Sequence, residues 1–319
     1  RKDWVSNLAE ANRSIIYPSA SASFIPTSAF PELKSDIISL LKLRAGYGTS
    51  ANFPFGYPIA ATLNLDTQSF IKNGNYVIAN TSGSVLGNPD LKPERIDELE
   101  IGVEGRFFNN RLSLDLSIYN KKTNDLIINR PLDPSTGYTS TQTNIGLIEN
   151  KGVELDLSFD WIQSNDGLNW NTSMNWSTND AIVVDLGEDT DKIVYAGFGT
   201  LGNAAIPGES LGTIIGSSNT RDSSIENFRW LPGNSVVNNQ GSYAITQDPT
   251  IIGDANPDWI ANVSNSISYK NLSFNFLFNY QQGGDIFTYT VATLLGRGLS
   301  SDTLDRELSF ILPGVNANG

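Results

Sequence analysis

The chain has 319 residues, 21 of them basic and 34 acidic, for a formal net charge of −13. It contains no His, no Cys and one Met, which excludes His- and Cys-based nucleophiles, zinc sites built from these ligands, and disulfide bonds. The acidic balance, without any run of Lys or Arg, also argues against nucleic acid as a partner. We expect no catalytic residue, no metal site and no cofactor.

Alternation of apolar and polar residues with period two is the strongest pattern along the chain. In the stretch that begins at Leu112, for example, Leu112, Leu114 and Leu116 alternate with Ser113 and Asp115. Such alternation predicts antiparallel strands with one apolar and one polar face. It recurs across residues 98–107, 112–118, 153–161, 168–176, 262–269 and 272–280.

Short and long connections alternate between these predicted strands. Short turns are expected at 108–111, 163–167 and 270–271. Long loops are expected at 50–94, 126–148, 181–256 and from 284 onward. All short turns then fall on one edge of the sheet and all long loops on the other, which we call the short-turn edge and the long-loop edge. This layout is typical of a transmembrane β-barrel, although a soluble sandwich can also carry long loops at one end.

Aromatic residues mark both ends of the predicted strands. Rings at both membrane interfaces are typical of barrels. The alternative is that these rings form the core of a sandwich. Phe107, Trp161, Trp170 and Tyr269 lie beside the short turns, and Trp176, Trp259 and Tyr280 lie near the long loops.

The polar face carries a cluster of carboxylates on three successive strands. A row of carboxylates is too costly to bury in a dry core, so these side chains must face water or a polar partner. The cluster could simply line a hydrated lumen, or it could dock basic groups of a plug or a cationic substrate. Its main members are Glu98, Glu100, Glu104, Asp115, Glu154 and Asp156.

Aromatic residues in the predicted loops are candidates for contact with a substrate or a partner lid. Exposed rings on loops can stack on sugars or on peptide side chains, and they can equally pack loop against loop. The candidates are Phe53, Phe55, Tyr57, Tyr138, Phe198 and Trp230.

Several sequence motifs resemble those of TonB-dependent outer-membrane receptors, and in particular the SusC/RagA branch. The first is Asn88-Pro89-Asp90-Leu91-Lys92-Pro93-Glu94, whose prolines cannot join a strand ladder, so the strand is expected to start after them. The others are residues 144–154, which look like a strand entering the barrel, residues 206–212, which look like a Gly-rich loop segment, and residues 252–259 with the hairpin reaching 282–285.

The resemblance implies a large all-β architecture. Residues 1–319 would form part of one antiparallel transmembrane β-barrel of about 22 strands, as in this family. The plug domain, the segment that contacts TonB and the C-terminal strands would lie outside this chain. The resemblance suggests eight strands, near 15–25, 38–49, 95–107, 111–125, 149–161, 168–180, 258–269 and 271–283.

The resemblance also implies a function. The protein would sit in the bacterial outer membrane and import oligosaccharides or peptides with energy delivered by TonB. A SusD-like surface lipoprotein would cap the long-loop edge, and two transporters could pair as a homodimer. No enzyme activity is expected.

Two other classes of protein remain open from the residues alone. One is a soluble β-sandwich that binds glycans through its loop aromatics. The other is a small porin or adhesin barrel of about eight strands, complete near Gly319.

Overall fold

The structure is a computed structural model that describes residues 1–187, 190–198, 200–221, 235–305 and 314–316. The chain divides into two compact units. The first contains Arg1–Tyr195, Ala205–Leu211 and Pro257–Gly283, and the second contains Ala196–Ala204, Gly212–Asn256 and Gly284–Gly319. Among the described residues, no helix combines the length and the hydropathy needed to span a membrane.

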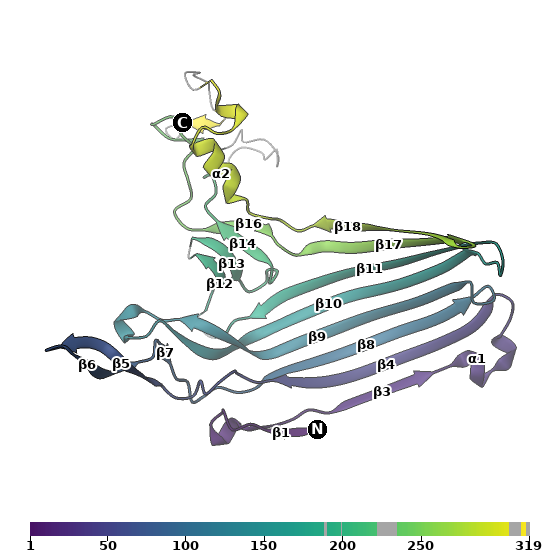
Figure 1. The fold of residues 1–319 in the computed structure, drawn as a ribbon, viewed down its shortest axis with the longest axis horizontal. Coiled ribbons are helices and arrows are strands. Elements are labelled where there is room, and N and C mark those ends of the chain that lie inside the picture. The colour runs from purple at the N-terminus through teal and green to yellow at the C-terminus, as the bar shows by residue number, and fades with distance from the viewer. Residues whose placement is uncertain (188–189, 199, 222–234, 306–313, 317–319) are drawn as a thin grey trace. The chain divides into compact units, whose positions relative to one another are not determined.

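Eight strands of the first unit form one antiparallel sheet in which each strand pairs with its neighbours in chain order (Figure 1). All eight predicted strands are confirmed. Over the described residues the sheet is open, with β3 and β18 as its edges. In order, the strands are β3 (Ser19–Phe24), β4 (Ile38–Asn52), β8 (Glu94–Phe107), β9 (Leu112–Pro131), β10 (Ser140–Ile162), β11 (Leu168–Asp185), β17 (Pro257–Tyr269) and β18 (Leu272–Gly283).

The strand register keeps the two faces of the sheet chemically separate. Leu155 of β10 lies opposite Leu116 and Trp176 on the neighbouring strands, whereas Asp156 lies opposite Asp115 and Asn175. Because successive side chains of a strand point to opposite faces, a one-residue slip would exchange the two sets. The alternating pattern therefore fixes the pairing, and it gives the sheet an apolar face and a polar face.

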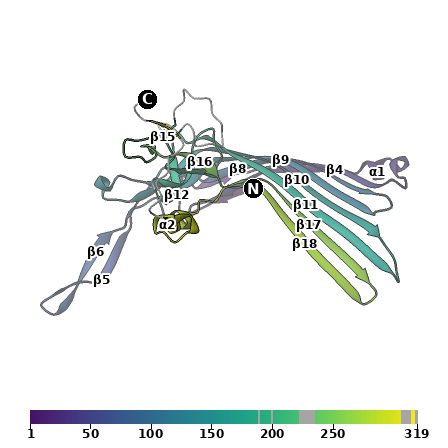
Figure 2. The ribbon, with the colours of Figure 1, turned by 90° about the horizontal axis from the view of Figure 1, so that it is seen from above.

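Three central strands are much longer than a bilayer crossing requires. β9, β10 and β11 contain 20, 23 and 18 residues. A transmembrane strand needs only about 9–11 residues. The surplus of β9 and β10 lies at the long-loop edge, where β9 extends to Pro131 and β10 begins at Ser140. The long loops expected at 126–148 and 181–256 are therefore partly strand. Figure 2 shows β9, β10 and β11 side by side.

The short-turn edge is built from tight turns, with one larger connection. Phe108, Asn109 and Asn110 all have positive φ, between 54° and 65°, in the turn between β8 and β9. Asparagine tolerates this left-handed region better than most residues, which explains the pair of Asn there. The connection between β3 and β4 differs, because it carries the helix α1 (Pro26–Ala29) and the 3-10 turn η2 (Pro31–Leu33).

Aromatic side chains pair at both ends of the strands. At the short-turn edge the rings of Trp161 and Trp170 lie 5.5 Å apart, and Trp170 Nε1 donates to Asn265 Oδ1 at 3.1 Å. At the long-loop edge the rings of Trp259 and Tyr280 stack at 5.0 Å. The indole N–H of Trp170 is thus satisfied by a polar partner, as a ring at an apolar–polar boundary requires.

Shorter elements occupy the remaining connections. In the first unit β1 pairs with β2, β5 pairs with β6, and β7 adds to β10. Elsewhere β12, β13, β14 and β16 form a four-stranded sheet, and β15 pairs in parallel with β19. These elements are β1 (Lys2–Trp4), η1 (Glu10–Asn12), β2 (Ser14–Ile16), β5 (Leu63–Lys72), β6 (Asn75–Ser82), β7 (Val85–Leu86), η3 (Pro134–Thr136), β12 (Ile193–Phe198), β13 (Leu201–Ala205), β14 (Thr213–Gly216), β15 (Val236–Val237), β16 (Thr250–Asp254), α2 (Tyr289–Gly296), η5 (Ser301–Thr303) and β19 (Val315–Asn316).

Candidate functional site

The six carboxylates predicted to share a surface lie on the polar face of β8, β9 and β10. The register places Glu104, Asp115 and Asp156 in one row across these three strands. Glu154 lies in the next row, opposite Ser117 of β9. Glu98 and Glu100 continue the polar face of β8 toward the long-loop edge, because they alternate with Leu99 and Ile101.

Two cations on β4 neutralise part of this cluster. Lys42 Nζ lies 3.0 Å from Glu104 Oε2. Arg44 bridges two strands, with its Nε 3.3 Å from Glu100 Oε1 and its Nη2 2.8 Å from Asp115 Oδ1. Sequence reasoning missed both cations, although their alternation with Leu41 and Leu43 places them on a polar face.

The remaining three carboxylates have no cationic partner among the described residues. These are Glu98, Glu154 and Asp156, whereas Glu100, Glu104 and Asp115 are each paired. Partly exposed ion pairs contribute little stability, but they do cancel charge. Three of the six carboxylates are therefore neutralised by an ion pair and three are not, and Lys121 of β9 lies opposite one of these three, Glu98.

Gly102 of β8 allows Arg44 to reach across a strand. A Cβ atom at Gly102 would lie 2.5 Å from Arg44 Nε and 2.8 Å from its Cζ. The guanidinium therefore lies directly over the glycine on its way from β4 to Asp115 of β9, and it also donates to Ser117 Oγ. A glycine in the interior of a strand is otherwise unfavourable, and here it makes room for this contact.

We predict that Gly102→Ala destabilises the full-length barrel, because the methyl group displaces Arg44 from Asp115 and Glu100. The expected loss is about 1 kcal/mol, that of a charge-assisted hydrogen bond discounted for exposure. Gly48→Ala is the matched control, because Gly48 also lies within a strand and its Cβ would meet nothing within 4 Å. Thermal unfolding in detergent measures both variants, and equal stability of the two would contradict this role for Gly102.

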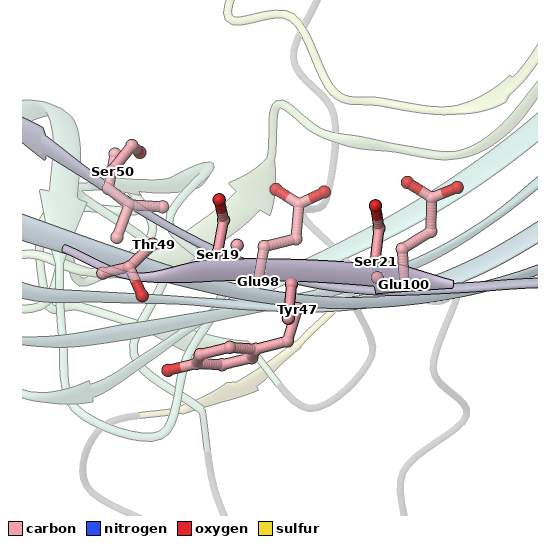
Figure 3. A pocket seen from close by; sticks show the side chains of 11 residues that line it. Ser19, Ser21, Tyr47, Thr49, Ser50, Glu98 and Glu100 are labelled. Carbon is pink, nitrogen blue, oxygen red and sulfur yellow. The ribbon is translucent and has the colours of Figure 1, made fainter. Parts of the chain in front are cut away.

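A groove in the polar face lies over β3, β4 and β8 (Figure 3). It has a volume of about 460 Å³. Figure 3 shows Glu98, Glu100, Ser19 and Ser21 on one side of the sheet and Tyr47 on the other. Because Ser19, Ser21 and two glycines of β4 carry small or no side chains, the two glutamates stand beside open space.

The loop aromatics are not gathered into one site by the described part of the structure. Phe55 and Tyr57 are 96% and 66% exposed in the segment that follows β4, and Phe53 beside them is half-buried. Tyr138 is half-buried in the separate connection between β9 and β10. Trp230 and the side chain of Phe198 lie outside the described residues. A role for any of the six in substrate contact stays a prediction.

The motif at residues 88–94 anchors the start of β8. Leu91 is fully buried, and Asn144 of β10 accepts from Lys92 N at 2.7 Å and donates to Lys92 O at 2.8 Å. Glu94 accepts from Ile127 N at 2.7 Å and from Asn52 Nδ2 at 2.8 Å. The strand begins at Glu94, directly after Pro93, as predicted. The motif is therefore structural, since its polar groups clamp β8 to β4, β9 and β10.

The geometry defines one class of protein. One face of a long antiparallel sheet is apolar, the other is polar and charged, tight turns lie at one edge, and aromatic pairs lie at both ends. A sheet of this kind is the wall of a transmembrane β-barrel, with lipid on one side and water on the other. Among the described residues, no group of three or more Asp and Glu side chains is arranged to hold a metal ion.

Comparison with known proteins gives the family. The profile described as "TonB dependent receptor-like, beta-barrel" matches residues 1–275, and the chain belongs to this family of outer-membrane barrels. TonB-dependent receptor P26 of Formosa agariphila is 30% identical over 90% of this chain. TonB-dependent receptor SusC of Bacteroides thetaiotaomicron is 26% identical over 86% of it.

Solved structures agree with the sequence relatives. A structure titled "Structure of the RagAB peptide transporter" superimposes with a TM-score of 0.69 and 25% identity over 88% of this chain. This chain spans 30% of P26, 28% of SusC and 31% of that solved chain. The family match excludes the soluble sandwich, and its members are receptors and transporters rather than enzymes.

Proposed function

We propose that the full-length protein imports oligosaccharides or peptides across the outer membrane in a TonB-dependent manner. The observation that carries the proposal is the match to the receptor barrel family over residues 1–275. The similarity to SusC and to a structure titled as a peptide transporter supports a solute larger than those that diffuse through porins. In this proposal a SusD-like lipoprotein covers the long-loop edge.

The role of this chain in transport is to form a wall rather than to do chemistry. Its apolar face meets lipid, so the barrel is stable in the membrane. Its polar face keeps the lumen hydrated and offers hydroxyl, amide and carboxylate groups to a passing solute. Glu98, Glu154 and Asp156, which form no ion pair within the described residues, add negative charge to that path, which favours cationic over anionic solutes.

Deletion of the gene is expected to abolish uptake of the substrate, and complementation is expected to restore it only in cells with TonB. Uptake is measured with fluorescent peptides and with labelled oligosaccharides in parallel, in cells with and without the SusD-like partner. Loss of the partner should weaken uptake at low substrate concentration. Unchanged uptake of every probe after loss of TonB would overturn the proposal.

A further inference from the structure

A small apolar pocket lies on the first unit, further along β10 toward the long-loop edge than the acidic rows. It has a volume of about 250 Å³. Ile148, Leu186, Ile193 and Ala205 form its buried floor, each at most 8% exposed. Leu126 and Ile128 of β9 contribute partly exposed side chains to its lining. The pocket could not be predicted from the sequence, because its residues come from several separate segments.

The pocket has a firm wall because residues 205–211 are bonded along the end of β11. Val183 N donates to Glu209 O at 3.0 Å, and Gly208 N donates to Val183 O at 2.7 Å. Leu211 N donates to Ala181 O at 2.8 Å. This segment thus acts as a short additional strand beyond the reach of β17, whose pairing with β11 covers Leu168–Ser177.

The pocket opens on the polar face of the sheet. Ile148, Asn150 and Glu154 all occupy even-numbered positions of β10. Because alternate side chains of a strand point to the same face, these three point the same way. A solute that moves along the polar face therefore passes this pocket. The rest of that face carries mostly charged, amide and hydroxyl groups, including Lys42 and Arg44, so an apolar recess there is a distinct feature.

Two polar side chains at the lining, Asp185 and Tyr195, each make a hydrogen bond within the protein. Asp185 Oδ1 accepts from Gly187 N at 3.2 Å, and the Tyr195 hydroxyl donates to the carbonyl of Leu211. A sugar ring buried there would leave hydroxyl groups without partners, at a cost of roughly 1–3 kcal/mol each. An apolar side chain has no hydroxyl groups to leave without partners, and its transfer from water into the pocket lowers the free energy.

The size of the pocket matches one side chain. An apolar cavity of about 150 Å³ already holds benzene, whereas pockets for drug-sized ligands measure roughly 300–1,000 Å³. At about 250 Å³, this pocket accommodates one aromatic or branched aliphatic group. A sugar chain is too large and too polar for it.

We propose that this pocket binds one apolar side chain of a peptide substrate and thereby selects peptides over oligosaccharides. The inference rests on the proposed function and specifies its substrate class. A peptide fits both surfaces. Its apolar side chain suits the apolar pocket, and its polar backbone suits the acidic and amide-rich face around the pocket. The similarity to a structure titled as a peptide transporter points the same way.

The test uses two fluorescent peptides that differ only in one Phe or Ser residue, and the complete transporter purified in detergent with its partner. The wild-type protein should bind the Phe peptide about tenfold more tightly or better, as burial of one aromatic side chain implies. Ala205→Phe fills the floor of the pocket and should abolish this preference. Equal affinity of the wild type for both peptides would overturn the inference.

A second pair of variants tests the pocket independently, in case Ala205→Phe does not fold. Ile128→Ser makes the pocket lining polar and should reduce the Phe preference at least threefold. Ile127→Ser is the matched control, because Ile127 is the adjacent half-buried residue of β9 and does not line the pocket. An undiminished preference in Ile128→Ser, or an equal loss in both variants, would contradict the proposal.

Uptake assays separate failure of this inference from failure of the proposed function. If TonB-dependent uptake of peptides persists without a preference for Phe, the pocket has no role and the transporter proposal stands. If only oligosaccharides are imported, the pocket proposal fails and TonB-dependent import stands. If no probe depends on TonB, the proposed function itself fails.

Discussion

Leu155→Arg is expected to block assembly of the barrel, whereas Asp156→Arg, one residue further along β10, is expected to leave it intact. Leu155 lies on the apolar face between Leu116 and Trp176, and Asp156 lies on the polar face between Asp115 and Asn175. An arginine held in lipid near the bilayer midplane costs about 2–4 kcal/mol. That is a large part of the roughly 5–15 kcal/mol that stabilises a typical protein.

The measurement is the amount of full-length protein in the outer membrane and its heat-modifiable mobility on gels. The two variants carry the same new side chain on adjacent residues of one strand, so each serves as the control for the other. Similar amounts of folded Leu155→Arg and Asp156→Arg protein would mean that the two faces have been assigned wrongly.

Removal of the carboxylates that form no ion pair is expected to change the preference of the transporter for cationic over anionic peptides. A triple variant, Glu98→Gln, Glu154→Gln and Asp156→Asn, removes the carboxylates that have no cationic partner among the described residues. Uptake of a peptide with two extra Lys residues should fall about tenfold relative to its two-Glu counterpart, since focused fields alter association rates by roughly 10–10³. The ratio should also shrink with added salt.

A companion variant replaces the paired carboxylates, with Glu100→Gln, Glu104→Gln and Asp115→Asn. This variant also removes three negative charges, but it leaves Lys42 and Arg44 without their partners. It should lower the thermal stability of the barrel and weaken uptake of the Lys peptide even more strongly, because two cations are exposed. An unchanged Lys-to-Glu uptake ratio in both variants would rule out electrostatic selection by this face.

Period-two alternation was enough to predict six of the eight strands and the two faces, whereas β3 and β4 were expected only from the family resemblance. Within residues 98–104 of β8, 112–118 of β9 and 153–160 of β10 the apolar residues alternate with polar ones or glycine. The observed register keeps Leu116, Leu155 and Trp176 in one apolar row. The start of β8 was also predictable, because Pro93 cannot donate to a ladder. These features are local, so they can be predicted from a single segment.

Features that depend on register or on distant segments were not predictable. The extensions of β9 and β10 lose the alternating pattern near Asp125 and Gly146, which both adopt positive φ, at 55° and 57°. A side chain at Gly146 would meet Asp185 O at 1.7 Å, so that position requires glycine. The contacts of Arg44 with Asp115 depend on residues that lie 71 positions away in the chain.

Cysteine accessibility along β10 tests the central claim most directly, and these 319 residues contribute no native Cys to the labelling. Single Cys residues are introduced at each position from Val153 to Ser158 of the full-length protein in the outer membrane. A charged, water-soluble thiol reagent should label positions 154, 156 and 158 and spare positions 153, 155 and 157. Equal labelling at all six positions, or the opposite alternation, would contradict a barrel wall with lipid on the leucine face and water on the carboxylate face.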